Sequence, residues 1–130
     1  MDVAKKYSDL EINAATICAE AGGESYAGKV AVGDVIATRA MKSNTSLRTV
    51  CLASKQFSCW NNRGTMEQRM QTMRKHPAWD ECVVIANKIS QPGYRPSSPA
   101  THYFNPELAN PSWAQQLRRV AIVGKHWFFC

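Results

Sequence analysis

The pair Gly22-Gly23 separates two long helical patterns, and this break constrains the fold more than any other feature of the sequence. A first helix is expected over Asp9–Ala21, because Ser8 and Glu11 have the spacing of a capping box and apolar residues then recur every three or four positions. A second helix is expected over Tyr26–Met41 and is apolar nearly all round, which is typical of a buried central helix. We expect the glycines to end the first helix as a left-handed C-cap.

Two carboxylates flank this break, four residues apart. Glu20 falls in the last turn of the first helix, where the negative end of the helix dipole and the apolar neighbours Ala19 and Ala21 disfavour the ionised form and raise its pKa. Glu24 precedes the second helix, where the dipole favours the anion. Carboxyls whose pKa values are pushed apart are typical of acid and base roles in catalysis. The alternative for Glu24 is that it only helps to cap the second helix.

The remaining sequence predicts shorter helices over residues 47–53, 67–75 and 77–90. The loop 91–99 is rich in Pro, Gly and Ser, residues 100–106 are extended in character, and two apolar runs flank Gly124-Lys125 as in a β-hairpin. We therefore predict a mainly α (α+β) fold, in which residues 1–130 form a single domain with a small C-terminal β-hairpin.

A formal net charge of +6 favours an anionic partner, such as nucleic acid, a membrane surface or an acidic cell-wall polymer. No helix-turn-helix, RRM or zinc pattern supports nucleic acid, and no apolar run is long enough to span a bilayer. The N-terminal segment lacks the apolar core of a signal peptide, so we expect a soluble protein made in the cytoplasm.

The five cysteines and three histidines lack the spacing of a metal site, so neither a metal nor a cofactor is expected. Cys18 and Cys82 fall inside apolar helical patterns, where a buried free thiol is usual. Cys51, Cys59 and Cys130 lie at the ends of elements, and one disulfide among them stays open for an oxidising compartment.

Aromatic and polar residues alternate in the loop that contains Gln56, Phe57, Ser58 and Trp60. A sugar-binding cleft needs apolar ring faces to stack on pyranose rings, and amides and hydroxyls to bond the ring substituents. The loop therefore fits a sugar-binding cleft. The alternative interpretation is that Phe57 and Trp60 anchor the loop in the core.

Several short motifs stand in a constant order over nearly the whole chain: CAEAGGE at 18–24, QFS at 56–58, ATHYFN at 100–105, PSWA at 111–114 and IVGKHWF at 122–128. Together they resemble the cell wall hydrolase family typified by the spore cortex-lytic enzymes SleB and CwlJ, which also occurs among phage endolysins. The family's first motif is similar to YGEARGE, so Ala19 stands here in place of a Gly and Gly22 in place of an Arg.

The resemblance implies a lysozyme-like, mostly helical fold that cleaves the glycan strand of peptidoglycan, as a muramidase or as a lytic transglycosylase that leaves a 1,6-anhydro product. By this resemblance, Glu20 corresponds to the catalytic glutamate of the family. Glu24 is the second catalytic candidate. A conventional two-carboxylate mechanism stays open beside a single-acid one. Six residues are the candidates for binding the glycan: Gln56, Phe57, Ser58, His102, Tyr103 and Asn105.

The expected partner is the peptidoglycan glycan strand, bound by a monomer that neither binds nucleic acid nor inserts stably into a membrane. Two other classes remain: a non-catalytic basic module that binds cell wall or nucleic acid, and an amidase or peptidase acting on the cross-linking peptides. A bare catalytic domain without a signal peptide fits a phage endolysin that reaches the periplasm through a holin pore, or a mature form whose signal has been removed.

Overall fold

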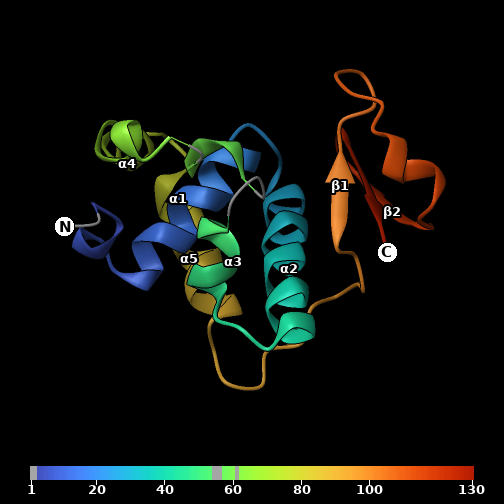
Figure 1. Ribbon diagram of the computed structural model, residues 1–130, viewed down its shortest axis with the longest axis horizontal. Coiled ribbons are helices and arrows are strands. Elements are labelled where there is room, and N and C mark those ends of the chain that lie inside the picture. Colours follow the sequence, from blue (N-terminus) through green and yellow to red (C-terminus); the bar gives the residue numbers. More distant parts are fainter. Residues whose placement is uncertain (1–2, 54–56, 61) are drawn as a thin grey trace.

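The computed structural model of the chain describes residues 3–53, 57–60 and 62–130 (Figure 1). Short 3-10 helices cover Val3–Lys6, Ser58–Trp60, Arg63–Thr65 and Ser112–Gln115. The α-helices are α1 (Asp9–Ala21), α2 (Tyr26–Ser43), α3 (Leu47–Leu52), α4 (Met66–Arg74) and α5 (Trp79–Ile89), and the strands are β1 (His102–Phe104), β2 (Arg119–Val123) and β3 (His126–Phe129). The predicted mainly α fold is confirmed.

Helix α2 lies between the other helices and the sheet (Figure 1). Its residue Ile36 belongs to the larger core, which α1, α3, α4 and α5 share, whereas Val32 and Val35 pack with Phe128 of β3 in a second core. All four of these side chains are at most 1% exposed. The prediction of a buried central helix is therefore confirmed, and α2 joins the two parts of the molecule.

The sheet is antiparallel in the order β1-β3-β2. The predicted hairpin is confirmed as β2 and β3, with Gly124 in the turn at a φ of +58°, and the extended segment supplies β1 as a third strand. Since alternate residues of a strand face opposite sides, Tyr103 contacts Phe128 on the face toward α2, whereas His102 and Phe104 contact Trp113 on the other face.

The two ends of α1 have different explanations. At the start, Ser8 and Glu11 form the predicted capping box, with reciprocal hydrogen bonds of 3.1 Å. At the end, the prediction of a left-handed cap is wrong, because Gly22 has φ −57° and ψ −30°. Gly22 is required by a close approach instead, since a Cβ there would lie 3.0 Å from the ring of His76 and 2.5 Å from the carbonyl oxygen of Cys18.

All five cysteines are free thiols. Cys18 and Cys82 are buried, as predicted, and so are Cys51 and Cys59, while Cys130 is partly exposed. Burial raises the pKa of Cys51, Cys59 and Cys82 to about 12, so these thiols stay protonated at neutral pH. In the described part of the chain, no helix combines the length and apolarity that crossing a membrane needs.

Candidate active site

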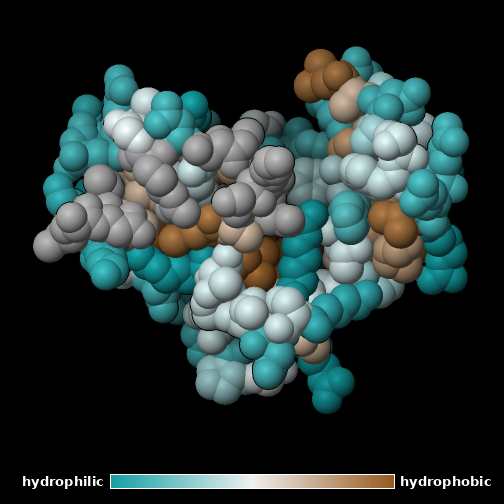
Figure 2. Space-filling model, viewed as in Figure 1, coloured by the Kyte–Doolittle hydropathy of each residue, from teal (hydrophilic) through white to brown (hydrophobic). Residues whose placement is uncertain are grey.

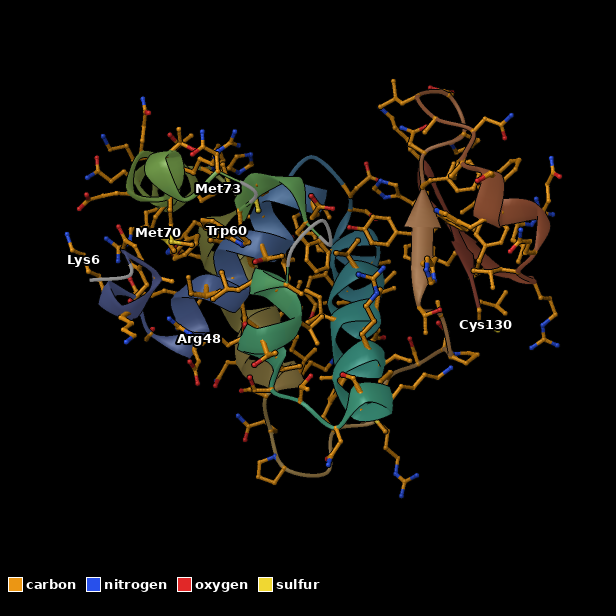
Figure 3. The ribbon with its side chains drawn as sticks, viewed as in Figure 1. Lys6, Arg48, Trp60, Met70, Met73 and Cys130 are labelled. Carbon is orange, nitrogen blue, oxygen red and sulfur yellow. The ribbon has the colours of Figure 1, made fainter. Side chains whose placement is uncertain are left out.

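Glu20 lies in the last turn of α1, where the end of the helix meets the inner face of the sheet. The hydroxyl of Tyr103 on β1 donates a hydrogen bond of 2.5 Å to Oε1 of Glu20. One turn earlier in α1, the indole N–H of Trp60 donates to Thr16 Oγ1 at 2.7 Å, which ties the loop before α4 to the helix (Figure 3). The hydrogen bond between Glu20 and Tyr103 thus connects α1 with β1, which are far apart in the sequence.

Burial raises the pKa of Glu20 above the ordinary value of a glutamate, and this is the largest influence on it. The hydrogen bond from Tyr103 and the electrostatic effects of His126 and Arg39 lower the pKa of Glu20, in that order of size. The net effect keeps Glu20 protonated at a higher pH than a free glutamate, which is what a general acid requires.

Tyr103 and Arg39 complete the surroundings of Glu20. Burial and the nearby Glu20 carboxylate raise the pKa of Tyr103 well above its usual range, so Tyr103 remains a hydroxyl donor. Arg39 of α2 donates from Nε to the carbonyl oxygen of Thr101 at 2.6 Å, and its guanidinium lies over the ring of Phe57, 5.5 Å from the ring centroid. These contacts fix the direction of the Arg39 side chain.

The carboxylate of Glu24 contacts the turn of the hairpin. Its Oε1 accepts a hydrogen bond of 3.2 Å from the backbone N–H of Lys125 and lies 3.6 Å from Nδ1 of His126. A Cβ on Gly124 would lie 2.7 Å from the same oxygen, so only glycine fits this contact. Glu24 therefore fastens the β2–β3 turn to the loop between α1 and α2.

His102 and Asn105, two further candidates from the sequence, lie at the start of β1 and just after its end. His102 lies 2.9 Å from Thr101 Oγ1 through Nδ1 and 4.9 Å from Trp113 between ring centroids, and burial lowers its pKa, which favours the neutral imidazole. Asn105 accepts a hydrogen bond of 2.9 Å from the N–H of Glu107 in the turn after β1.

Phe57 is 2% exposed and Trp60 is 3% exposed, so both lie in the core. This arrangement matches the alternative interpretation, in which the two rings anchor the loop, and it leaves the ring of Phe57 without a face for a sugar. Gln56 and the side chain of Ser58 lie outside the described residues.

Sequence reasoning did not assign Arg39 and His126 to the site. His126 lies on β3, where its ring meets the edge of Tyr103 at a centroid distance of 5.2 Å. His126 falls in a motif that carries the family resemblance, and Arg39 is a rare charge in an otherwise apolar helix. Those two signals could have pointed to them.

A cavity of about 540 Å³ opens beside these residues, between α2, α3 and β1. Arg39 and His102 form part of its wall, while Glu20 and Tyr103 lie next to that wall rather than in it. Figure 2 shows the surface hollowed between the helical part and the sheet, with a hydrophilic strip over α2. The cavity is therefore connected to Glu20 through Arg39, which lies in the cavity wall and acts electrostatically on the glutamate.

A mainly helical domain with a small antiparallel sheet, and with a glutamate at their boundary, defines a lysozyme-like fold. The chain belongs to the cell wall hydrolase family, whose model matches residues 23–129. This match begins after Glu20, so the assignment of Glu20 rests on the geometry described above and on the resemblance of the first motif.

Two curated relatives are spore cortex-lytic enzymes. The enzyme of Bacillus subtilis strain 168 is 27% identical over 121 residues, and that of Halalkalibacterium halodurans is 28% identical over 124 residues. Each alignment covers 93% of this chain but only 37% and 34%, respectively, of the relative. The chain thus spans little more than a third of the length of these two relatives.

Two solved structures share the fold over almost their whole length. The catalytic domain of the germination-specific lytic transglycosylase SleB from Bacillus anthracis has a TM-score of 0.71 and 25% identity, with 95% of this chain and 97% of that chain covered. The catalytic domain of the Bacillus cereus SleB protein has a TM-score of 0.68 and 26% identity, with 95% and 92% covered. Both neighbours are catalytic domains, so the chain matches that part of such enzymes.

Proposed function

We propose that this chain cleaves the glycan strands of peptidoglycan at the cell wall, with Glu20 as the general acid and base. The observation that carries the proposal is the partly buried carboxyl of Glu20, whose pKa is raised by burial and whose Oε1 is held by the hydroxyl of Tyr103. Membership of the cell wall hydrolase family and likeness to a catalytic domain described as a lytic transglycosylase support it.

The first step is donation of a proton to the glycosidic oxygen of the leaving sugar. Because Oε1 of Glu20 accepts the hydrogen bond from Tyr103, we assign the acidic proton to Oε2, which then donates it to the substrate. Once the proton has left, the same hydrogen bond and the positive charge of Arg39 stabilise the carboxylate. Groups that oppose the raised pKa of the resting acid thus stabilise its conjugate base.

In the second step, the Glu20 carboxylate removes a proton from the 6-hydroxyl of the substrate as this oxygen bonds to the anomeric carbon. The product is a 1,6-anhydro sugar, and no second carboxylate is needed. A two-carboxylate mechanism needs a partner roughly 5 to 5.5 Å away in retaining enzymes, or 6.5 to 9.5 Å away in inverting ones. We assign Glu24 to fastening the hairpin, because its Oε1 already accepts from Lys125, so the single-acid mechanism is the favoured one.

Among the other sequence candidates, we keep His102 and Asn105 as contacts for the glycan, since both side chains are partly exposed near β1. Tyr103 orients Glu20, and Phe57 supports Arg39 from the core. Gln56 and Ser58 remain predictions from the sequence.

The substitution Glu20→Gln tests the proposal. The amide keeps the shape of the side chain and can still accept from Tyr103, but it has no acidic proton to donate. We expect the release of soluble fragments from purified peptidoglycan to fall at least about 100-fold, while sedimentation with the same peptidoglycan is retained. Glu107→Gln, an identical change at an exposed position, is the control. Undiminished release by Glu20→Gln would remove Glu20 from the mechanism.

The reaction type is tested on the products. Mass spectrometry of fragments released by the wild type should find 1,6-anhydro ends, which are lighter by one water than the ends that hydrolysis leaves. Reducing ends alone would overturn the single-acid mechanism and return Glu24 or a bound water to consideration. Newly exposed amino groups without cleaved glycan would instead indicate an amidase or a peptidase.

A further inference from the structure

The cavity between α2, α3 and β1 has a lining that is cationic on one side and otherwise consists mainly of small apolar and hydroxyl-bearing residues. Two cations, Arg39 and Lys42, stand on its α2 side, and its described lining contains no carboxylate and no side-chain amide. Small apolar groups and hydroxyls make up most of the remaining wall: Val50, Ala53, Ser43, Thr45, Thr49 and Thr101. His102 is the one ring in that lining, so the cavity offers little for stacking on a sugar.

The cationic side of the cavity is built on fixed contacts. Arg39 is held by its hydrogen bond to the carbonyl oxygen of Thr101, and the hydroxyl of Ser43 donates to the carbonyl oxygen of Arg39 at 2.7 Å. Lys42, in the last turn of α2, also lines the cavity and is exposed to solvent. A carboxylate that enters therefore meets one oriented guanidinium, which also interacts electrostatically with Glu20, and one exposed lysine.

We propose that this cavity binds the acidic peptide that N-acetylmuramic acid carries, beside the bond that Glu20 cleaves. Such peptides combine alanine methyl groups with carboxylates, which match the small apolar surface around Val50 and Ala53 and the cations of α2. The inference rests on the proposed function and adds to it a determinant of substrate specificity.

The position of the cavity fits this assignment. Arg39 lies in its wall and acts electrostatically on Glu20, and His102 in its wall precedes Tyr103 on β1. The peptide is attached to the muramic acid itself, so a strand placed with a muramic acid at Glu20 brings the peptide next to the reacting bond. Binding of the peptide would then select strands that still carry it.

The experiment compares two substrates prepared from one peptidoglycan that is free of teichoic acid. One consists of glycan strands with their peptides, and the other of the same strands after an amidase has removed the peptides. The variants are Lys42→Met, which removes the charge, and Lys42→Glu, which reverses it. Lys88→Glu, on the exposed face of α5 and outside the cavity lining, is the matched control.

On peptide-bearing strands, we expect kcat/KM to fall about threefold for Lys42→Met and about tenfold for Lys42→Glu, mainly through KM, because a partly exposed charge contact is lost or made repulsive. On peptide-free strands, the three variants should stay within about twofold of the wild type. If the Lys42 variants lose kcat/KM equally on both substrates, or lose none on either, the inference is overturned. Cleavage of both substrates by the wild type would still uphold the proposed function. A wild type that cleaves neither substrate overturns both.

Discussion

The hydroxyl of Tyr103 decides which oxygen of Glu20 carries the acidic proton, because it occupies Oε1 as a donor. It also lowers the pKa that burial raises, so it sets the pH up to which the acid form persists. In the proposed mechanism, this one hydroxyl therefore affects both the position of the acidic proton and the pKa of Glu20. Its energetic effect can be separated from that of the ring, because phenylalanine retains the contacts of the ring with Phe128 and His126.

We predict that Tyr103→Phe lowers kcat about tenfold, because the acidic proton is no longer confined to Oε2. It also moves the alkaline limb of the pH profile of kcat to higher pH, since a contact that lowers the pKa of Glu20 is lost. Assays of fragment release from peptidoglycan across a pH series measure both effects. An unchanged pH profile would contradict the assigned role.

Tyr94→Phe is the control for this change, because the hydroxyl of Tyr94 also donates to a carboxylate, that of the buried Asp34. Ser97 donates to the same carboxylate through its N–H and its hydroxyl. Loss of the Tyr94 hydroxyl should cost about 1 kcal/mol of the free energy of unfolding and leave the pH profile of cleavage in place.

The residues of the site were predictable only in part. Glu20 and Tyr103 stand in recognisable motifs, but the hydrogen bond between them joins positions 83 residues apart, which local patterns do not encode. Arg39 and His126 act through the packing of α2 and β3 around Glu20, so their part was missed. Phe57 belongs to a loop with the composition expected of a sugar site, and yet its ring lies in the core. Composition alone does not tell which side chains of a loop are buried.

The start of helix α1 follows from local sequence signals, whereas the conformation at its C-terminal end depends on what packs against it. The capping box and the periodicity predict α1 over its observed bounds, and the extended segment and the hairpin predict the strands, although not that β1 pairs with β3. The cap at Gly22 was predicted wrongly because His76, from the segment before α5, packs directly against that glycine. A left-handed cap occurs instead at Asn44, at the end of α2, where φ is 54°.

A matched pair of substitutions tests this explanation of the end of α1. Gly22→Ala should lower the free energy of unfolding by about 1 to 3 kcal/mol, because its Cβ meets Cys18 and His76. It should also lower kcat, since Glu20 lies two residues before it in the last turn of the helix. Gly23→Ala, with nothing within 4 Å of the added carbon, should leave both quantities nearly unchanged. Urea unfolding and fragment release measure them, and equal effects of the two variants would refute the packing argument.

For the whole molecule, the partly buried carboxyl of Glu20 is hydrogen-bonded to Tyr103, whose side chain packs against both cores. Burial of an ionisable group that finds no full compensation is a cost to the entire fold, because unfolding returns the group to water. The proposed role of Glu20 as an acid and the stability of the fold at neutral pH therefore make opposite demands on one residue. A trade-off of this kind, in which a group needed for activity lowers the stability of the fold, is common at active sites.

The pH dependence of stability measures that cost. In the unfolded chain, Glu20 titrates near 4.5, and in the folded chain its pKa is higher. Between these two values the folded state binds more protons than the unfolded state, so its stability falls as the pH rises through this window. Well below 4.5 the cost is absent, and above the folded pKa it is present in full.

We therefore predict that Glu20→Gln, which cannot ionise, gains free energy of unfolding relative to the wild type as the pH is raised from about 4 to neutrality. Urea unfolding of both proteins across this range gives the difference, in which contributions shared by the two proteins, such as that of His102 with its lowered pKa, cancel. Glu107→Gln, at an exposed position, controls for the loss of one negative charge from the surface. A difference that stays constant with pH, or that shrinks toward neutrality, would mean that the fold does not raise the pKa of Glu20 and would remove the physical basis of its role as the acid.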